Sequence, residues 1–253
     1  MNNIKEQLNH TLKAINLDIG DSNYSGKVRE NYYMENEIIM ITTDRVSAFD
    51  HILGTIPFKG EVLTQIAKFW FEKTSKMVPN HYIGNPDPQV LLTKRAEPLP
   101  IEIIIRGYLT GSLWRDYSKG IDDQYGFKID AGMKKDQKFL EPIITPTTKA
   151  EYGMHDEPIS KEEIVSKLVD KDIYEKAESY AMDLFLEGQK WANQQGLILV
   201  DTKYEFGMID GELHVIDEIH TPDSSRYWMK DEYNERFNNG QNQLMLDKEN
   251  VRQ

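Results

Sequence analysis

The stretch from Leu197 to Glu218 constrains the fold of this chain more than any other, because it reads as a long β-hairpin. An apolar run leads into three charged residues at every second position, and Asp210-Gly211 then supplies a strong turn signal. Side chains two positions apart lie on the same face of a strand. We therefore predict one charged strand face, formed by Asp201, Lys203 and Glu205.

The opposite face of this strand should pack on a core through apolar side chains, namely Ile198, Val200, Tyr204 and Phe206. The second strand returns to Asp217 and Glu218, which gathers four carboxylates and a lysine at one end of the hairpin. Such a group suits a metal and phosphate site, since Mg²⁺ takes one or two carboxylates plus phosphate oxygens. A solvated strand face with a simple ion pair is the alternative interpretation.

The strand register decides whether Glu205 and Asp217 can share a metal. A regular two-residue hairpin around Asp210-Gly211 pairs Tyr204 with Asp217 and sends the two carboxylates to opposite faces. Joint binding requires an irregularity, so we predict either a β-bulge, with Gly207 as its candidate position, or a three-residue loop.

The composition restricts the class of protein and its partners. The chain has 253 residues, 30 basic and 42 acidic side chains, a net charge of -12 and no cysteine. An acidic balance argues against nucleic acid as the main partner, whereas a phosphorylated small molecule needs only a local basic pocket. Disulfides, thiolate metal sites and thiol nucleophiles are excluded. With no basic-then-apolar leader and no apolar run of membrane-spanning length, we expect a cytoplasmic protein without a membrane partner.

Periodicity and turn signals predict an order of elements along the chain. We expect a helix over 4–17, a strand–turn–strand unit over 26–43, a helix over 60–77, strands over 90–93 and 101–105, a loop over 119–146, and a helix over 171–195. Ser160 and Glu163 form a capping box that opens a further helix. We predict an α+β fold with a β-rich N-terminal domain, 1–100, and an α+β C-terminal domain, 101–253, and a site between them.

Charged residues in the N-terminal part are candidates for a phosphate site. Lys27 and Arg29 follow Gly26 and are expected on one strand face, although an exposed basic strand end is the alternative. Asp44 and Ser47 directly follow a strand that should be buried, so they either line a site or cap a helix.

Arg106 follows the β-branched run 103–105, which should be buried, and burying an unpaired arginine is costly. We therefore expect an anion beside it. Ser112 is expected to cap a short helix that reaches Tyr117, where free backbone N–H groups bind phosphate well. In the alternative, Arg106 pairs with a core carboxylate and Ser112 is only a helix cap.

Three further polar segments are less specific. Arg226 follows the hairpin and either joins the site or forms a plain salt bridge with Asp217 or Glu218. The segments 145–149 and His155-Asp156 carry little information by themselves.

Five motifs, in order and sensibly spaced over about residues 20–230, together resemble the phosphoribosylaminoimidazole-succinocarboxamide synthase (SAICAR synthetase) family. They are Gly26-Lys-Val-Arg29, Thr43-Asp-Arg-Val-Ser-Ala-Phe-Asp50, Arg106-Gly-Tyr-Leu-Thr-Gly-Ser-Leu-Trp114, Asp201-Thr-Lys-Tyr-Glu-Phe-Gly207, and Asp217-Glu218 through Asp223-Ser-Ser-Arg-Tyr-Trp228. Five motifs in register are far more specific than any one of them alone.

This resemblance implies a two-lobed fold similar to ATP-grasp enzymes and distantly to protein kinases, with ATP in the cleft between the lobes. It implies ATP-dependent ligation of L-aspartate to carboxyaminoimidazole ribonucleotide (CAIR), giving SAICAR, ADP and phosphate in purine biosynthesis. A carboxylate is a poor electrophile, so the implied route forms an acyl phosphate that the aspartate amine attacks. Mg²⁺ is the implied cofactor, and a homodimer stays open.

The resemblance also implies a role for each matching residue. The ATP phosphates would be held by Gly26, Lys27 and Arg29. The metal, and ATP through it, would be held by Glu205 and Asp217. The phosphate of the nucleotide substrate would be bound by Arg106, Ser112 and Arg226. Catalysis would involve Lys27 together with two residues beside the substrate's imidazole and carboxylate, Lys203 and Asp201. Further residues near substrate would be Asp44, Ser47 and Asp156.

Two other functions stay open on the sequence. The chain could be a different ATP-dependent kinase or ligase acting on a small carboxylate, which ADP formation with only one correct substrate would reveal. It could also be a nucleotide-binding module without activity. Loss of a metal ligand or of the phosphate lysine would mark such a module, and Glu205, Asp217 and Lys27 are all present.

Overall fold

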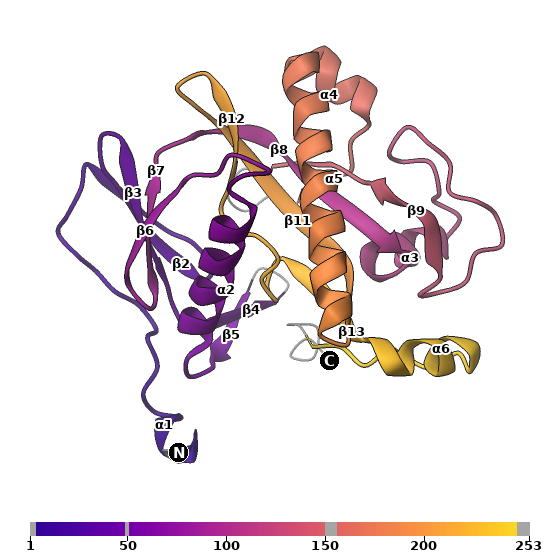
Figure 1. Ribbon diagram of the computed structural model, residues 1–253, viewed down its shortest axis with the longest axis horizontal. Helices are drawn as coiled ribbons and strands as arrows, with labels where there is room; N and C mark the ends of the chain where they lie inside the picture. The colour runs from indigo at the N-terminus through magenta and orange to yellow at the C-terminus, as the bar shows by residue number, and fades with distance from the viewer. Residues whose placement is uncertain (1–3, 49–50, 150–155, 247–253) are drawn as a thin grey trace.

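The computed structural model describes residues 4–48, 51–149 and 156–246, which form two large antiparallel β-sheets with helices packed on them (Figure 1). The chain begins with a short helix, α1 (Ile4–Gln7), builds the first sheet, and forms the second sheet from Glu97 onward. The α+β class predicted from the sequence is confirmed.

The first sheet has five antiparallel strands in the order β1-β2-β3-β7-β6. These strands are β1 (Ser22–Ser25), β2 (Arg29–Tyr33), β3 (Glu37–Thr42), β6 (Tyr82–Asp87) and β7 (Val90–Lys94). A small hairpin, β4 (Arg45–Ala48) and β5 (His51–Thr55), precedes helix α2 (Lys59–Thr74). The helix packs on the sheet because Leu63, Ala67 and Trp70 recur at helical spacing and are buried.

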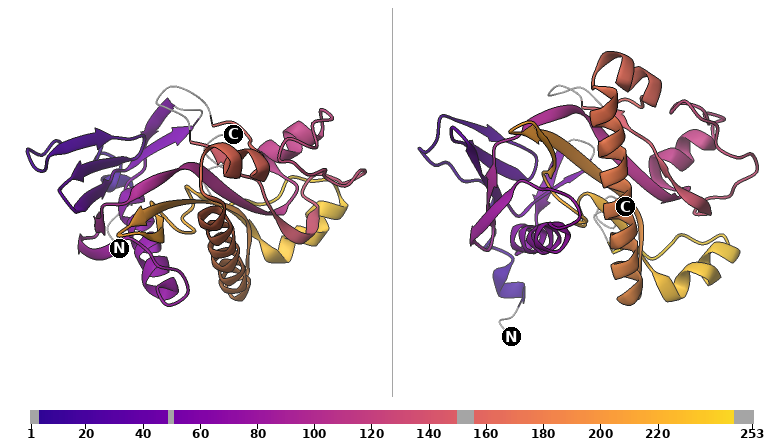
Figure 2. Two further views of the ribbon diagram at one scale, coloured as in Figure 1. Left: turned by 90° about the horizontal axis from the view of Figure 1, so that it is seen from above. Right: turned by 45° about the horizontal axis from the view of Figure 1, so that its top comes forward.

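The second sheet is built around two long neighbouring strands, β8 (Glu97–Tyr108) and β11 (Leu197–Ile209). The strands that pair with β8 are β9 (Lys138–Ile144) and β10 (Thr147–Thr148), and those that pair with β11 are β12 (Glu212–Ile216) and β13 (Ser225–Met229). Helix α5 (Lys171–Gln194) runs along one side of this sheet, and Figure 2 shows α2 and α5 on the same side of the two sheets. The shorter helices are α3 (Gly111–Tyr117), α4 (Lys161–Lys167) and α6 (Lys230–Asn238).

One hydrophobic core continues from the first sheet to the second. Phe71 of α2, Ile103 of β8, Phe185 of α5 and Tyr204 of β11 belong to the same cluster of buried side chains. Truncating a buried aromatic side chain of this kind costs about 3–5 kcal/mol. The shared core therefore fixes the position of one sheet relative to the other.

The backbone also connects the two sheets. Val215 of β12 donates to the Pro79 carbonyl at 2.9 Å, and His81 donates to the Val215 carbonyl at 3.3 Å. Along the chain, the first sheet ends at Lys94 and the second begins at Glu97. This change falls close to the predicted domain boundary at residue 100, and the division into two domains stays a prediction.

The β11–β12 hairpin lacks the irregularity predicted for it. Glu205 pairs with Ile216, and the strands stay in regular register up to a two-residue turn. Asp210 and Gly211 have φ values of 51° and 81°, as a type I′ turn requires. The predicted bulge at Gly207 and the predicted three-residue loop are therefore wrong for this pairing. A register shift near Gly207 does occur, but between β11 and β8.

Asp217 changes its direction without a bulge. Its φ of 65° is left-handed, a conformation that few residues other than glycine adopt. Strand alternation ends at Ile216, and the Asp217 carboxylate reaches Arg29 of the first sheet. Burial raises the pKa of Asp217, and the nearby negative charges of Glu205 and Glu218 add to this effect. Strand alternation does not predict the direction of the Asp217 side chain, because the strand ends one residue earlier, at Ile216.

Strand β11 contains a second irregularity. Tyr204 and Phe206 belong to the main core, as predicted, but Ile198 and Val200 pack in a separate small cluster. The register with β13 shifts between residues 199 and 201. An extra residue at that point exchanges the two faces of the strand, so the prediction of one continuous apolar face is wrong.

The predicted N-terminal helix over 4–17 is also mostly wrong, since α1 ends at Gln7. Beyond it, contacts with the rest of the protein replace helical hydrogen bonds. The Leu12 N–H donates to Asp44 Oδ2 at 2.8 Å, and the Leu17 N–H donates to the Tyr32 hydroxyl at 3.0 Å. Backbone hydrogen bonds to other segments therefore hold this part of the chain.

The segment 119–146, predicted as a loop, contains strand β9, because its last part pairs with β8. The predicted capping box is confirmed at the start of α4, where the Glu163 N–H donates to Ser160 Oγ. Within the described part of the chain, no helix is long and apolar enough to cross a membrane.

Candidate active site

A polar cavity of about 430 Å³ lies where β8, β11 and the segment 222–226 meet. Seven residues predicted for the site line it, namely Lys27, Arg106, Ser112, Asp156, Asp201, Lys203 and Arg226. Glu102 and Ile104 also line it, because they share a face of β8 with Arg106. The cavity thus brings together charged residues that lie far apart in the sequence.

Two arginines meet one carboxylate in this cavity. Asp201 is the strand partner of both Arg106 on β8 and Arg226 on β13. Its Oδ2 lies 2.6 Å from Arg226 Nη1 and 3.5 Å from Arg106 Nη1. Arg106 is only 4% exposed, and both guanidinium groups lie against the same carboxylate. Such a cluster favours a phosphate group, which guanidinium groups bind through several charged hydrogen bonds.

The start of α3 completes this arginine cluster. Arg106 Nη2 donates to Ser112 Oγ at 3.3 Å, and Arg106 Nε donates to Thr145 Oγ1 at 2.8 Å. The N-cap of α3 is Thr110, so the prediction that Ser112 caps this helix is wrong. Gly111 has a φ of 60°, and a Cβ there would lie 2.1 Å from Arg226 Nη1. Because glycine has no Cβ, the Arg226 guanidinium can occupy this space.

Lys203 lies between two carboxylates. Its Nζ is 2.6 Å from both Glu102 Oε1 and Glu205 Oε1, and Lys149 Nζ contacts the other Glu205 oxygen. Burial lowers the pKa of Lys203, but Glu205 and Glu102 outweigh it and hold that pKa well above its usual value. Burial likewise opposes ionisation of Glu205, yet the two lysines hold its pKa below the usual range. Burial raises the pKa of Glu102, which has one lysine partner, above its usual value.

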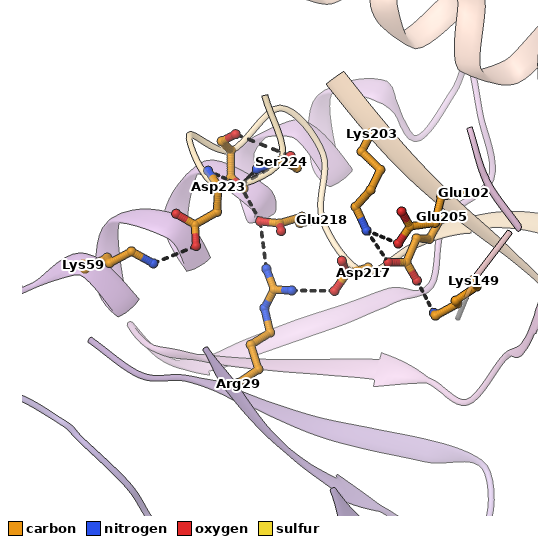
Figure 3. Close-up of polar contacts among 11 residues, drawn as sticks. Arg29, Lys59, Glu102, Lys149, Lys203, Glu205, Asp217, Glu218, Asp223 and Ser224 are labelled. Carbon is orange, nitrogen blue, oxygen red and sulfur yellow. Dashed lines mark hydrogen bonds and ion pairs between the residues drawn. The ribbon is translucent and has the colours of Figure 1, made fainter. Parts of the chain in front are cut away.

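Arg29 joins the first sheet to the end of the hairpin (Figure 3). Its Nη1 lies 2.5 Å from Asp217 Oδ1, and its Nη2 lies 2.8 Å from Glu218 Oε2. Burial is the main influence on Asp217 and raises its pKa, although Arg29 opposes the change. Figure 3 shows this pair next to the Lys203, Glu205 and Lys149 contacts.

The donor set of Glu205 and Asp217 fits Mg²⁺, provided that phosphate oxygens and water complete the coordination shell. Among the described residues, no group of three or more Asp, Glu, His or Cys side chains is arranged to hold a metal by itself. Both carboxylates are paired with cations, Glu205 with Lys203 and Lys149 and Asp217 with Arg29. Metal binding here would exchange some of these partners for the ion.

Lys27 lies in the turn between β1 and β2. Its spacing to Arg29 had predicted a position on a strand, and that prediction is wrong. Arg45 fixes this turn by donating from Nε to the Lys27 carbonyl at 3.0 Å and from Nη2 to the Gly26 carbonyl at 2.8 Å. The Lys27 side chain is exposed and lines the cavity, whereas the Arg29 side chain is buried in its ion pairs. Lys27 therefore faces the cavity, whereas Arg29 contacts the carboxylates at the end of the hairpin.

The Asp44 carboxylate accepts backbone hydrogen bonds from two other segments. Its Oδ1 accepts a hydrogen bond from the Gly60 N–H at 2.9 Å, and its Oδ2 accepts one from the Leu12 N–H at 2.8 Å. Ser47 lies on β4, and neither residue is among the described residues that line the cavity. Three residues of the predicted motifs and polar segments lie outside the described residues, namely Phe49, Asp50 and His155.

Sequence reasoning missed several contributors to the site. Glu102 could have been found, since it lies four residues before Arg106 and thus on the same strand face. The segment 145–149 supplies a hydroxyl and a lysine whose partners only the fold reveals. Lys59 Nζ, at the start of α2, lies 2.8 Å from Asp223 Oδ2, and no local pattern indicates this ion pair.

Comparison with known families gives a match over most of the chain. A family model described as SAICAR synthetase matches residues 22–253. The phosphoribosylaminoimidazole-succinocarboxamide synthase of Bacteroides thetaiotaomicron is 50% identical over 233 residues, which cover 91% of this chain and 74% of that protein. A putative phosphoribosylaminoimidazole-succinocarboxamide synthase 2 of Agrobacterium fabrum is 51% identical over 236 residues, covering 90% of this chain and 75% of that protein.

Solved structures with the same fold carry related names. A structure named SAICAR synthase is 32% identical, has a TM-score of 0.82, and matches 95% of this chain and 86% of its own. The SAICAR-synthase of Saccharomyces cerevisiae complexed with SAICAR is 33% identical, with a TM-score of 0.78 and coverage of 87% and 80%. A SAICAR synthetase in complex with ADP has a TM-score of 0.74 at 23% identity, covers 91% of this chain and 90% of its own, and shows likeness of fold.

Proposed function

The chain belongs to the SAICAR synthetase family, and on that premise we propose how its cavity carries out the reaction. The activity is that of a SAICAR synthase, a ligase of purine biosynthesis. We propose that it joins L-aspartate to CAIR and converts ATP to ADP and phosphate. The arginine cluster of Arg106, Asp201 and Arg226, beside Lys203 in one cavity, carries this proposal. It offers cationic groups for the phosphate and for the carboxylate of a single nucleotide.

The proposed reaction has two balanced steps. An oxygen of the CAIR carboxylate attacks the γ-phosphorus of ATP, and the bond to the bridging oxygen breaks to release ADP. The aspartate amine then attacks the acyl carbon, and phosphate leaves with the electron pair of the broken C–O bond. The nitrogen loses a proton, and the product is an amide. Because phosphoryl transfer depends mainly on positioning and charge neutralisation, the protein needs no covalent nucleophile.

Arg106, Ser112 and Arg226 would bind the 5′-phosphate of CAIR. Arg106 and Arg226 both line the cavity and both contact Asp201, so the two guanidinium groups lie close together where an anion can bind. Asp201 would hold the two guanidinium groups in place beneath the nucleotide. This arrangement supports a phosphate subsite beside the two guanidinium groups.

Lys203 would bind the reacting carboxylate of CAIR. Its ammonium group is held between Glu102 and Glu205, so its position is set before the substrate arrives. The carboxylates keep Lys203 protonated, and a protonated lysine lowers the repulsion between the substrate carboxylate and the phosphates of ATP. Asp156 lines the cavity too, which supports its expected place beside the substrate.

Gly26, Lys27 and Arg29 would hold the phosphates of ATP, with Glu205 and Asp217 as ligands of Mg²⁺. Bound there, Mg²⁺ would neutralise charge on the transferred phosphoryl group. The fixed turn at Gly26 and Lys27 supports this assignment, because it aims Lys27 at the cavity. Asp44 would contribute indirectly, by holding the first turn of α2 and the segment around Leu12, and Ser47 would contribute through its place on the neighbouring strand β4.

The test is phosphate release from ATP by the purified protein, with CAIR and aspartate present or omitted in turn, and product identification by mass. We expect full turnover and SAICAR only with all three substrates. A partial ADP burst with CAIR alone would support the acyl phosphate. ADP formation at full rate without aspartate would instead identify a kinase and refute the ligase proposal.

A further inference from the structure

A buried carboxylate holds the start of α3. Asp136 lies just before β9, which Figure 1 shows next to α3, and it is only 3% exposed. Its Oδ1 accepts a hydrogen bond from Thr110 Oγ1 at 2.6 Å. Because burying a carboxylate costs free energy unless hydrogen bonds compensate for it, this contact helps to keep Asp136 in its place.

The side chain of Thr110 makes this contact instead of capping α3. A threonine at the N-cap usually accepts a hydrogen bond from the first turn of its helix, but Thr110 forms no such bond. The backbone reinforces the contact, since the Asp136 N–H donates to the Leu109 carbonyl at 2.8 Å and the Leu109 N–H donates to the Gln137 carbonyl at 2.9 Å. Asp136 has a left-handed φ of 64°, which these contacts maintain.

The turn that follows Thr110 touches both arginines of the cavity. Ser112 Oγ accepts a hydrogen bond from Arg106 Nη2 at 3.3 Å. The Gly111 backbone lies so close to Arg226 that a Cβ on Gly111 would be 2.1 Å from Arg226 Nη1. A shift of this turn therefore changes the surroundings of both guanidinium groups.

We propose that Asp136 is a positioning residue that fixes, through Thr110, the turn that lies against the two arginines. The proposal rests on the phosphate subsite proposed above. Charged hydrogen bonds to a phosphate depend on distance and angle, so the position of each guanidinium group decides how well it binds. Asp136 is not among the described residues that line the cavity, and it acts through the turn and not on the substrate.

Four variants separate this role from general support of the fold. Thr110→Val removes the hydroxyl and keeps the shape of the side chain, whereas Thr110→Ser keeps the hydroxyl. Thr110→Val/Asp136→Asn also lacks the hydroxyl but buries no unpaired charge, so it replaces the single variant if Thr110→Val unfolds. Tyr233→Phe is the matched control, because the Tyr233 hydroxyl donates to the Asp136 carbonyl at 2.9 Å and its ring stacks on Trp228. It removes another contact of Asp136 and leaves the Thr110 contact intact.

The measurement is calorimetric binding of CAIR, its dephosphorylated riboside, ribose 5-phosphate and ATP, with urea unfolding of each variant alongside. We expect Thr110→Val and the double variant to bind CAIR and ribose 5-phosphate about tenfold more weakly, equivalent to about 1.4 kcal/mol. Riboside and ATP should bind as before. Thr110→Ser and Tyr233→Phe should bind CAIR within about twofold of the unaltered protein. In Thr110→Val the KM for CAIR should rise and kcat should stay within about twofold, because the change removes binding and not catalysis.

Unchanged CAIR binding in Thr110→Val and in the double variant, or equal weakening of riboside and CAIR, would overturn the proposal. An equal loss in Tyr233→Phe or in Thr110→Ser would overturn it as well, since Asp136 would then only support the segment. Failure of the proposed function is distinguishable, because the unaltered protein would then bind ribose 5-phosphate but not CAIR. A loss of ribose 5-phosphate binding in Thr110→Val would still support the positioning role, whereas a protein that binds neither ligand would refute both.

Discussion

Replacing Gly111 by alanine tests the phosphate subsite through one added methyl group. The Cβ would lie 2.1 Å from Arg226 Nη1 and 2.4 Å from Cζ, so the guanidinium must leave its place. A left-handed φ of 60° adds strain of about 1–2 kcal/mol for a residue other than glycine. Displacing one partner of a buried charge pair costs about 2–4 kcal/mol in binding. We therefore expect Gly111→Ala to weaken CAIR binding roughly 30- to 1,000-fold.

Gly120→Ala provides the control for backbone strain. Gly120 has a φ of 83°, also left-handed, but a Cβ there would meet nothing within 4 Å. Urea unfolding should show a loss of about 1–2 kcal/mol from backbone strain in Gly120→Ala and a larger loss in Gly111→Ala, which also displaces Arg226 from Asp201. Calorimetry should show weakened CAIR binding only for Gly111→Ala. If Gly111→Ala binds CAIR within twofold of the unaltered protein, Arg226 does not form the phosphate subsite described above.

Three further predictions concern other parts of the site and the buried histidines. Arg106→Ala should weaken CAIR by about 2–4 kcal/mol and ATP by far less in calorimetry, and equal weakening of both would contradict its assignment. Lys27→Ala should lower the rate of the phosphoryl step at least about tenfold at saturating substrates, equivalent to roughly 1.4 kcal/mol of transition-state stabilisation, and the variant should still fold. Unaltered turnover would show that Lys27 is a solvated lysine without a role in catalysis. Burial lowers the pKa of both His81 and His220 from 6.5 to about 3, so between these pH values the unfolded chain binds protons that the folded protein does not. Stability should therefore fall on acidification, by up to about 1.4 kcal/mol per pH unit for each histidine. Urea unfolding at pH 7 and pH 5 should show a shallower loss for His81→Gln, and identical slopes would exclude its contribution.

Alternation along single strands predicted much of the site. It placed Asp201, Lys203 and Glu205 together on β11, and Lys203 does bridge to Glu205 on the same strand. It also placed Arg106 at the end of a buried strand, where an anion partner was expected and Asp201 was found. These successes share one cause, since a period of two is a local property of the backbone.

The remaining features depend on contacts between distant segments. Asp201 meets two arginines because β8 and β13 flank β11, an order that one strand's pattern does not contain. The irregularity between residues 199 and 201 exchanges the faces of β11, and the left-handed Asp217 redirects a carboxylate at the end of β12. Both are single-residue departures from regular geometry, and tertiary packing selects them.

The ion pairs around Asp217 couple the site to the arrangement of the sheets. Arg29 of β2 is bound to Asp217 and Glu218, and Lys59 of α2 is bound to Asp223, so the first sheet is attached to the segment after β12 by charged groups. A ligand that binds Arg29 or Asp217 replaces some of the ion pairs that attach the first sheet to this segment. By thermodynamic reciprocity, any effect of ligand binding on the strength of these ion pairs is matched by an equal effect of the ion pairs on the affinity for the ligand.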